Sequence, residues 1–157
     1  MTTPDPKPPA ASGNSRPTVR CTRRIQFCAG HRIWGHENVC AHLHGHNYVA
    51  LFHATAPELD PLGRVIDFSV LKSRLGRWIE ENWDHGFVLH RDDREAIDAV
   101  RRVPGQKLFL LPGNPTAENM ALHLLEVVAP AELAGLGVEV VKVTLWETEN
   151  CFAEVGQ

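Results

Sequence analysis

Alternating apolar and polar residues near both ends of the chain restrict its fold more than any other feature. Every second residue shares one face over residues 19–28, and the alternation returns over residues 138–147. Because successive side chains of a strand point to opposite faces, each stretch predicts a β-strand. Two more strands are expected, at about residues 43–56 and 151–155. The two ends of the chain are therefore expected to form a sheet together.

Two segments between these strands have a helical period instead. Asp67 stands at an N-cap position, and apolar residues then recur at helical spacing as far as about Trp83. A second helix is expected to begin at Asn114-Pro115-Thr116, with proline near its first turn, and to end at Pro130.

The resulting order of elements, β-β-α-α-β-β, predicts an α+β fold. In this arrangement an antiparallel sheet carries both helices on one face. The stretch between the helices, residues 84–106, is polar and is expected to be irregular, with a short helix near residues 94–102. A brief strand is expected at residues 107–111.

Length, charge and cysteine content restrict the class of protein. The 157 residues suit one domain, which we place at residues 18–157, after a tail over residues 1–17 whose Pro, Ser, Gly and Ala predict disorder. A net charge of -3 with scattered Lys and Arg predicts no nucleic-acid partner. No apolar run predicts a membrane span or a secretory signal. Four scattered cysteines without a CxxC pair favour a reducing, cytoplasmic location.

Nine histidines are the unusual residues, and three of them, His42, His44 and His46, occupy alternate positions. In a strand, residues i and i+2 lie ~6.6 Å apart on one face, so two imidazoles can bind one Zn²⁺. Residues i and i+4 lie ~13 Å apart, too far to share an ion. The strand therefore supplies one neighbouring pair, and His31 is favoured as the third ligand, with His36 as runner-up. Three imidazoles with an open fourth position are typical of catalytic zinc sites, although they also suit iron.

At this point several motifs resemble one family. Phe27-Cys28-Ala29-Gly30-His31, followed by Cys40 and His44-Gly45-His46, resembles the zinc and nucleophile region of the 6-pyruvoyltetrahydropterin synthase superfamily. Further matches follow in the same order along the chain: Val65-Ile66-Asp67-Phe68, Asp84-His85, Pro115-Thr116-Ala117-Glu118-Asn119 and Glu147-Thr148. Only the N-terminal tail lies outside the resemblance.

The resemblance implies the tunnelling fold, whose β-β-α-α-β-β units assemble into oligomeric barrels. These are commonly homohexamers built as dimers of trimers, with active sites at subunit interfaces. The resemblance also implies His31, His44 and His46 as the zinc ligands and leaves His42 out.

The three residues between Cys40 and His44 resemble the spacing in 6-carboxytetrahydropterin synthases of queuosine biosynthesis. That resemblance implies a lyase that converts 7,8-dihydroneopterin triphosphate to 6-carboxytetrahydropterin, releasing acetaldehyde and triphosphate. Two alternatives stay open. One is 6-pyruvoyltetrahydropterin synthase activity, a triphosphate elimination, in the same site. The other is a non-catalytic zinc-binding assembly module.

The same resemblance implies a role for each group. Zn²⁺ would act as a Lewis acid on the side-chain oxygens of the substrate. Cys40 would be the general base, although a free thiol has a pKa near ~8.5 and needs a cation or hydrogen bonds to favour the thiolate. Asp84 and His85 would form a proton relay. The family's DHxxLN pattern is replaced here by Asp-His-Gly-Phe-Val-Leu, so the asparagine that would support this loop is missing while the Asp-His pair is kept.

Glu147 has a case of its own from the residues. It shares a strand face with Val141, Val143 and Leu145, so an apolar row ends in a carboxylate that needs a partner. The amino group and ring N–H of a pterin offer such a donor pair. Trp34 lies in the loop between the predicted ligands, and the sequence does not decide whether it packs over the site.

Overall fold

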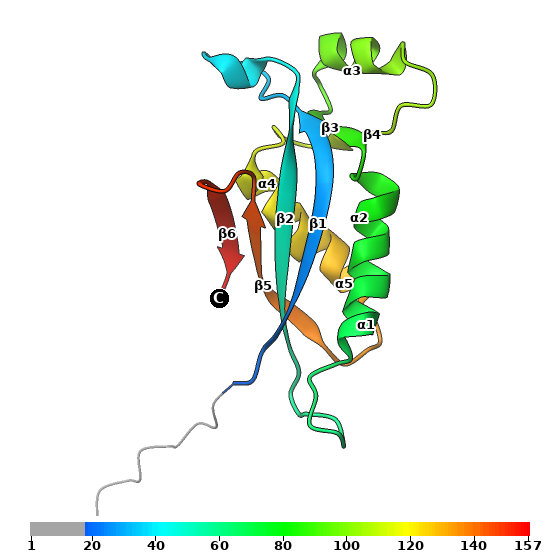
Figure 1. Ribbon diagram of the computed structural model, residues 1–157, viewed down its shortest axis with the longest axis vertical. Helices are drawn as coiled ribbons and strands as arrows, with labels where there is room; N and C mark the ends of the chain where they lie inside the picture. The colour runs from blue at the N-terminus through cyan, green and yellow to red at the C-terminus, as the bar shows by residue number, and fades with distance from the viewer. Residues whose placement is uncertain (1–17) are drawn as a thin grey trace, which may run out of the picture.

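The computed structural model describes residues 18–157, so the tail predicted for residues 1–17 lies outside the described residues. Within the described part, one six-stranded sheet has the order β4-β3-β1-β2-β5-β6 (Figure 1). Its strands are β1 (Cys21–His31), β2 (His44–Thr55), β3 (Gly86–His90), β4 (Leu108–Leu111), β5 (Glu139–Trp146) and β6 (Phe152–Gly156). The β1–β2, β2–β5 and β5–β6 pairs are antiparallel, as predicted, but β3 pairs in parallel with β1 and β4. The sheet is therefore mixed, which corrects the prediction of a purely antiparallel one.

Each predicted long helix is a run of three helical segments, continuous along the chain. The first comprises α1 (Phe68–Leu71), a π-helical turn (Lys72–Gly76) and α2 (Arg77–Asn82). The second comprises α4 (Ala117–His123), a π-helical turn (Leu124–Val128) and α5 (Ala129–Glu132).

The predicted starts of both helices are confirmed by their caps, but one predicted end is wrong. The Asp67 carboxylate accepts from the Ser69 N–H at 2.8 Å, and Thr116 Oγ1 accepts from the Asn119 N–H at 3.3 Å. Pro130 does not end the second helix, which continues to Glu132. The reason is that Pro130 lies in the first turn of α5, directly after the π-helical turn, where a missing N–H is tolerated.

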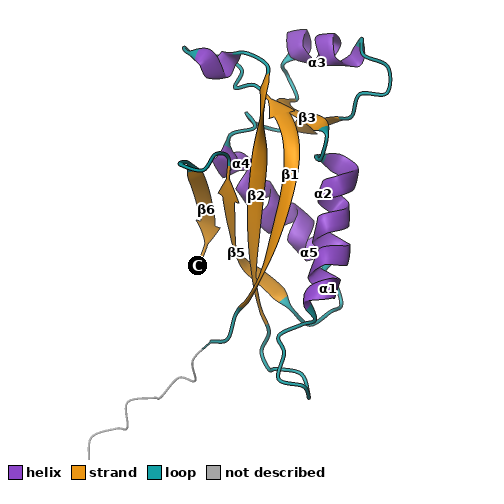
Figure 2. Cartoon of the chain, in the orientation of Figure 1, coloured by secondary structure: helices purple, strands orange, loops and turns teal. Residues whose placement is uncertain are grey.

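Both long helices pack on one face of the sheet, as predicted (Figure 2). The core joins strand residues to residues of both helices: Phe27, Tyr48, Phe52, Val143 and Leu145 with Leu71, Leu75, Ile79, Met120, Leu124 and Val128. Along β2 this buried face continues from Tyr48 to His46 and His44. The histidine-rich end of the strand therefore extends directly from the core, which gives the imidazoles a rigid support.

Residues 84–106 are more regular than the sequence predicts. They contain β3 and the helix α3 (Arg94–Arg101); the helix was predicted and the strand was not. Val88 faces the main core, while Leu89 packs with Ile97 of α3 in a second cluster. A short strand buried on both faces has no polar alternation, so its sequence carries no period-two signal.

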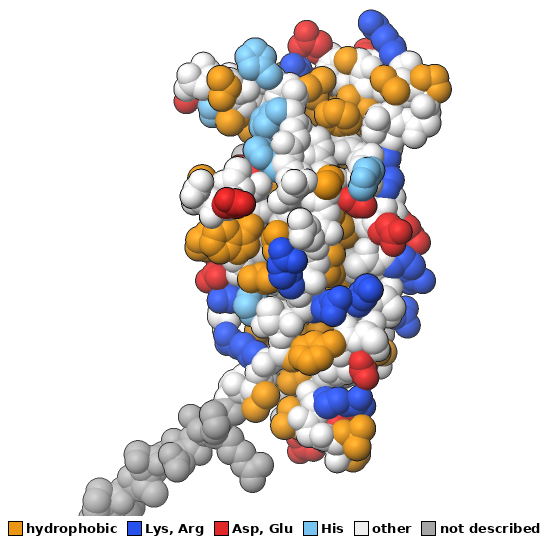
Figure 3. Space-filling view, viewed as in Figure 1, with side chains coloured by type: hydrophobic (Ala, Val, Ile, Leu, Met, Phe, Trp, Pro, Cys, Tyr) orange, Lys and Arg blue, Asp and Glu red, His pale blue; other side chains and the backbone are white. Residues whose placement is uncertain are grey.

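The face of the sheet opposite the long helices carries charged and apolar side chains side by side (Figure 3). Arg24 of β1 and Phe152 of β6 are exposed, and Lys142 of β5 forms a 3.1 Å ion pair with Glu154. Among residues 18–157, no helix has the length and apolar character needed to cross a bilayer.

Candidate metal and catalytic site

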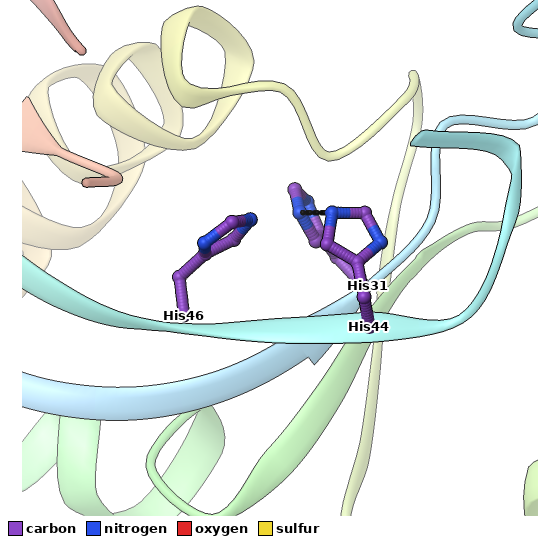
Figure 4. Close-up of side chains that lie close together, drawn as sticks. All are labelled: His31, His44 and His46. Carbon is purple, nitrogen blue, oxygen red and sulfur yellow. Dashed lines mark hydrogen bonds between the residues drawn. The ribbon is translucent and has the colours of Figure 1, made fainter. Parts of the chain in front are cut away.

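Three imidazoles converge where β1 ends and β2 begins. The antiparallel register places His31 opposite His44, and His46 shares the face of His44 two residues further on. The ring centroids lie 4.5 to 5.1 Å apart, and one nitrogen from each ring lies within 4.8 Å of the others (Figure 4). The structure thus brings together the three predicted metal ligands. His42 is exposed and is not a member of the cluster.

Hydrogen bonds to backbone carbonyls orient two of the rings. His31 Nδ1 lies 2.8 Å from the Pro115 oxygen, and His44 Nδ1 lies 2.7 Å from the His42 oxygen. Because a carbonyl only accepts, each Nδ1 carries the proton and each Nε2 presents a lone pair to the cluster.

The spacing of these two Nε2 atoms suits a shared ion. They lie 3.1 Å apart, the contact drawn as a dashed line in Figure 4. In the neutral tautomers neither atom has a proton to donate, so we interpret this contact as two ligand lone pairs rather than a hydrogen bond. Two nitrogens bound to one tetrahedral Zn²⁺ are separated by about 3.3 Å. The donor set therefore fits zinc.

Burial favours the neutral form of His31 and of His46. The pKa of His31 falls to about 4, chiefly because the ring is buried; the Pro115 carbonyl opposes the shift, while His44 and His46 add to it. Burial also lowers the pKa of His46, although the Glu147 carboxylate opposes this effect. Neutral imidazole is the form that binds a metal, so both rings are available near pH 7.

We expect the metal-free protein to lose stability as the pH falls from 6.5 towards 4. His31 has a pKa of about 4 in the folded protein and an ordinary value of 6.5 when unfolded, so the unfolded chain takes up the proton first. Neutral, buried His31 therefore makes its full contribution to the free energy of unfolding above pH 6.5. As the pH falls below 6.5 the free energy of unfolding decreases, by up to about 3 kcal/mol. Urea unfolding in a chelator, comparing wild type with His31→Gln from pH 4 to 7.5, measures this loss. Carboxyl groups titrate in both proteins, so parallel pH dependences would contradict the prediction.

The predicted base, Cys40, and the predicted pterin anchor, Glu147, line the same cavity of 220 Å³ beside the histidines. His31 lines it as well. Cys40 lies in a 3₁₀ turn (Val39–Ala41), and Glu147 follows the end of β5. Glu147 Oε1 lies 3.4 Å from His31 Nε2 and 3.9 Å from His46 Nε2. The carboxylate therefore lies against the histidines instead of extending into solvent.

The apolar row before Glu147 is slightly different from the predicted one. Val143 and Leu145 are fully buried, but Val140 takes the core position expected for Val141. The register of β2 against β5 shifts between His53 and Ala54, which are paired with Lys142 and Val140. This irregularity exchanges the buried and exposed positions of β5 between Val141 and the start of the strand.

Asp84 and His85 are not brought into this cavity. They contact each other, with His85 Nδ1 2.9 Å from Asp84 Oδ2, but His85 is 79% exposed. His85 lines a different cavity, of 390 Å³, together with Cys28 and Asn47. The side chains of Cys28 and Asn47 alternate with the buried residues of β1 and β2. This cavity therefore opens on the face of the sheet opposite the two long helices, the helix-free face.

The local structure explains how the pair is held. Asp84 Oδ1 accepts from the Cys28 N–H at 2.8 Å. Partial burial raises the pKa of Asp84, but the bonds from Cys28 and His85 outweigh it and the pKa is lowered overall. His85 has a φ of 56°, a left-handed backbone conformation that is uncommon for residues other than glycine.

Three residues that the sequence left open have structural surroundings of their own. His36 lines the 220 Å³ cavity, and its Nδ1 accepts from the Asn38 N–H at 2.9 Å. The carbonyl of His42 orients His44, and the ring of Trp34 packs on His90 at 5.1 Å.

Sequence reasoning missed two groups that touch His31. One is the Pro115 carbonyl, which no residue type could reveal. The other is Tyr48, whose hydroxyl lies 3.3 Å from His31 Nδ1 and whose pKa is raised by burial and by the nearby Glu147. Its position two residues after His46 was the available signal, since i and i+2 share a strand face.

Gly45 is explained by its neighbouring strand. A Cβ there would lie 3.1 Å from the Ala29 carbonyl oxygen, and the β1–β2 register is continuous through this position. Close approach of a backbone, rather than a bulge, therefore accounts for the glycine between His44 and His46.

Comparison with known proteins agrees with this geometry. The family model described as 6-pyruvoyl tetrahydropterin synthase matches residues 20–157. A protein of Rickettsia felis named 6-carboxy-5,6,7,8-tetrahydropterin synthase is 47% identical over 137 residues, covering 87% of this chain and 99% of the relative. A protein of the same name from Aquifex aeolicus is 33% identical, covering 85% of this chain and 94% of its own.

Solved structures show the same fold. An uncharacterized protein from Wolinella succinogenes superposes with a TM-score of 0.73 at 27% identity, covering 88% of this chain and 98% of that one. The 6-pyruvoyl tetrahydropterin synthase of Caenorhabditis elegans shares the fold with a TM-score of 0.62 at 23% identity, covering 90% of this chain and 96% of that one. With a family model matching nearly all of its described residues and relatives aligned over most of their length, this chain belongs to the 6-pyruvoyl tetrahydropterin synthase family.

Proposed function

We propose that this chain is a zinc-dependent lyase that converts 7,8-dihydroneopterin triphosphate to 6-carboxy-5,6,7,8-tetrahydropterin, releasing acetaldehyde and triphosphate. The observation that carries the proposal is a cluster of three imidazoles beside one cavity, which is lined by one of them, His31, and by Cys40 and Glu147. The names of the relatives at 45–47% identity support the carboxy product over the pyruvoyl product. By resemblance, we place the activity in the cytoplasm and in queuosine biosynthesis.

In this proposal His31, His44 and His46 hold the zinc, which when bound supplies a Lewis acid for the oxygens of the substrate side chain. Glu147 accepts the amino and ring N–H groups of the pterin, which fixes the ring in the cavity. Cys40, on the same cavity wall, accepts the protons that leave the substrate side chain.

The relay of Asp84 and His85 requires a second copy of the chain. Within one chain His85 lines the cavity on the helix-free face, whereas Cys40 lines the cavity beside the long helices. Because these cavities open on opposite faces of the sheet, we do not expect one substrate to contact both in a single subunit. We therefore propose a homo-oligomer, a hexamer built from two trimers, in which His85 of a neighbouring subunit completes the site.

Incubating the purified protein with 7,8-dihydroneopterin triphosphate tests this function. We expect acetaldehyde and 6-carboxytetrahydropterin in equal amounts, loss of turnover in excess chelator, and recovery when Zn²⁺ is restored. Release of triphosphate without acetaldehyde would instead establish the pyruvoyl-forming reaction. No turnover by a protein with its full metal content would favour a zinc-binding assembly module.

A further inference from the structure

The loop between β1 and the Cys40 turn is held by one amide side chain from a distant part of the chain. Asn114, which precedes α4, accepts from the Trp34 N–H through Oδ1 at 2.9 Å. Its Nδ2 donates to the Trp34 carbonyl, also at 2.9 Å. The amide therefore pairs with one residue's backbone as a neighbouring strand would, which fixes both the position and the orientation of Trp34.

This restraint reaches Cys40 in one further step. The N–H of Ile33, next to Trp34, donates to the Cys40 carbonyl at 2.8 Å, and the His36 N–H donates to the Ile33 carbonyl at 3.1 Å. The backbone of the proposed base is thus bonded directly to the segment that Asn114 holds.

The same short segment also orients a metal ligand. Pro115 follows Asn114, and its carbonyl oxygen accepts a hydrogen bond from His31 Nδ1. Two consecutive residues therefore contact both the loop of the base and the metal cluster. The side chain of Asn114 is hydrogen-bonded to the loop that contains Cys40, and the carbonyl of Pro115 is hydrogen-bonded to the ring of His31.

Asn114 is itself anchored to a rigid element. Its carbonyl accepts from the Thr116 N–H at 2.8 Å and from Asn119 Nδ2 at 2.9 Å. Asn119 belongs to α4, whose residues Met120 and Ala121 are fully buried in the core. Asn114 is therefore bonded both to a helix that is packed in the core and to a loop of largely exposed residues, and it fixes the loop relative to the helix.

We propose that Asn114 is a positioning residue that sets Cys40 relative to His31. The inference rests on the proposed function, in which Cys40 accepts protons from a substrate that also contacts the metal. Without the two bonds to Trp34, the loop is held to α4 less firmly and Cys40 shifts from its working position. Because proton transfer depends on sub-ångström alignment, such a shift lowers kcat more than it raises KM.

Asn114→Ala and the isosteric Asn114→Asp test the proposal. Aspartate keeps the acceptor for the Trp34 N–H but sets an oxygen against the Trp34 carbonyl, so we expect both variants to lose about 10- to 100-fold in kcat. Metal content and KM should change little. Asn82→Ala is the matched control, because Asn82 also donates from Nδ2 to a backbone carbonyl at 2.9 Å, that of Trp78 in α2; it should keep the wild-type kcat.

A second readout does not depend on turnover. Alkylation by iodoacetamide, followed by peptide mass spectrometry, gives the rate at Cys40 relative to that of glutathione added to the same mixture. Both Asn114 variants should change this ratio, and Asn82→Ala should leave it unchanged. An unchanged ratio overturns the proposal even if the wild type proves inactive on the pterin substrate. A changed ratio with wild-type kcat overturns it as well, because loop position would then not matter to catalysis.

Discussion

Replacing Cys40 by alanine is expected to lower kcat by about 10²- to 10⁴-fold, the usual contribution of a positioned general acid or base. The thiol lines the cavity that also contains His31 and Glu147 but is not one of the clustered metal ligands. Its removal should therefore leave zinc bound. Turnover is measured by acetaldehyde release, and metal content by mass spectrometry of the dialysed protein.

Cys21→Ala is the control for this prediction. Cys21 is a partly buried thiol at the other end of β1, and burial raises its pKa, so it should be inert. Near-normal turnover by Cys40→Ala would mean that another group is the base. Loss of zinc together with turnover would mean that Cys40 supports the metal site.

Replacing His46 by alanine is expected to remove both metal and turnover. Only three imidazoles are clustered in the described residues, and changes to groups that merely support a ligand already cost 10- to 100-fold in metal affinity. Loss of a ligand itself should therefore weaken zinc binding by at least about 100-fold. Competition with a chelating dye measures the affinity.

His53→Ala provides the matched control, because His53 lies on the same strand, β2, but faces the other side of the sheet. Its ring nitrogens contact Thr22 and Thr144, far along the strand from the metal cluster. This variant should keep its zinc. Retention of zinc by His46→Ala would overturn the assignment of the metal site.

The parts of the fold that could be predicted are those encoded by local pattern. Alternation located β1 and β5, and the other two expected strands correspond to β2 and β6. The start signals at Asp67 and at Asn114-Pro115-Thr116 located the two long helices. In each case burial on one face of an element leaves a period in the sequence. The π-helical turns in both helices have no such signature, since a one-residue change in spacing barely alters an apolar repeat.

The candidate site was predictable to a similar degree. Alternation on a strand limited His42, His44 and His46 to one neighbouring pair, and the resemblance then selected the ligands. The residues alone could not select them, because the pairing of His31 with His44 depends on the register of two strands. Register is a property of the sheet and not of either strand.

What the sequence by itself determined is therefore which elements form and which chemical groups each one carries, because periodicity, capping and residue type are local properties. The tertiary structure alone decided the parallel pairing of β3, the orientation of His31 by the Pro115 carbonyl and the separation of His85 from Cys40 on opposite faces of the sheet. Each of these depends on contacts between residues distant in sequence, and such contacts are set by how the faces of the whole chain bury one another.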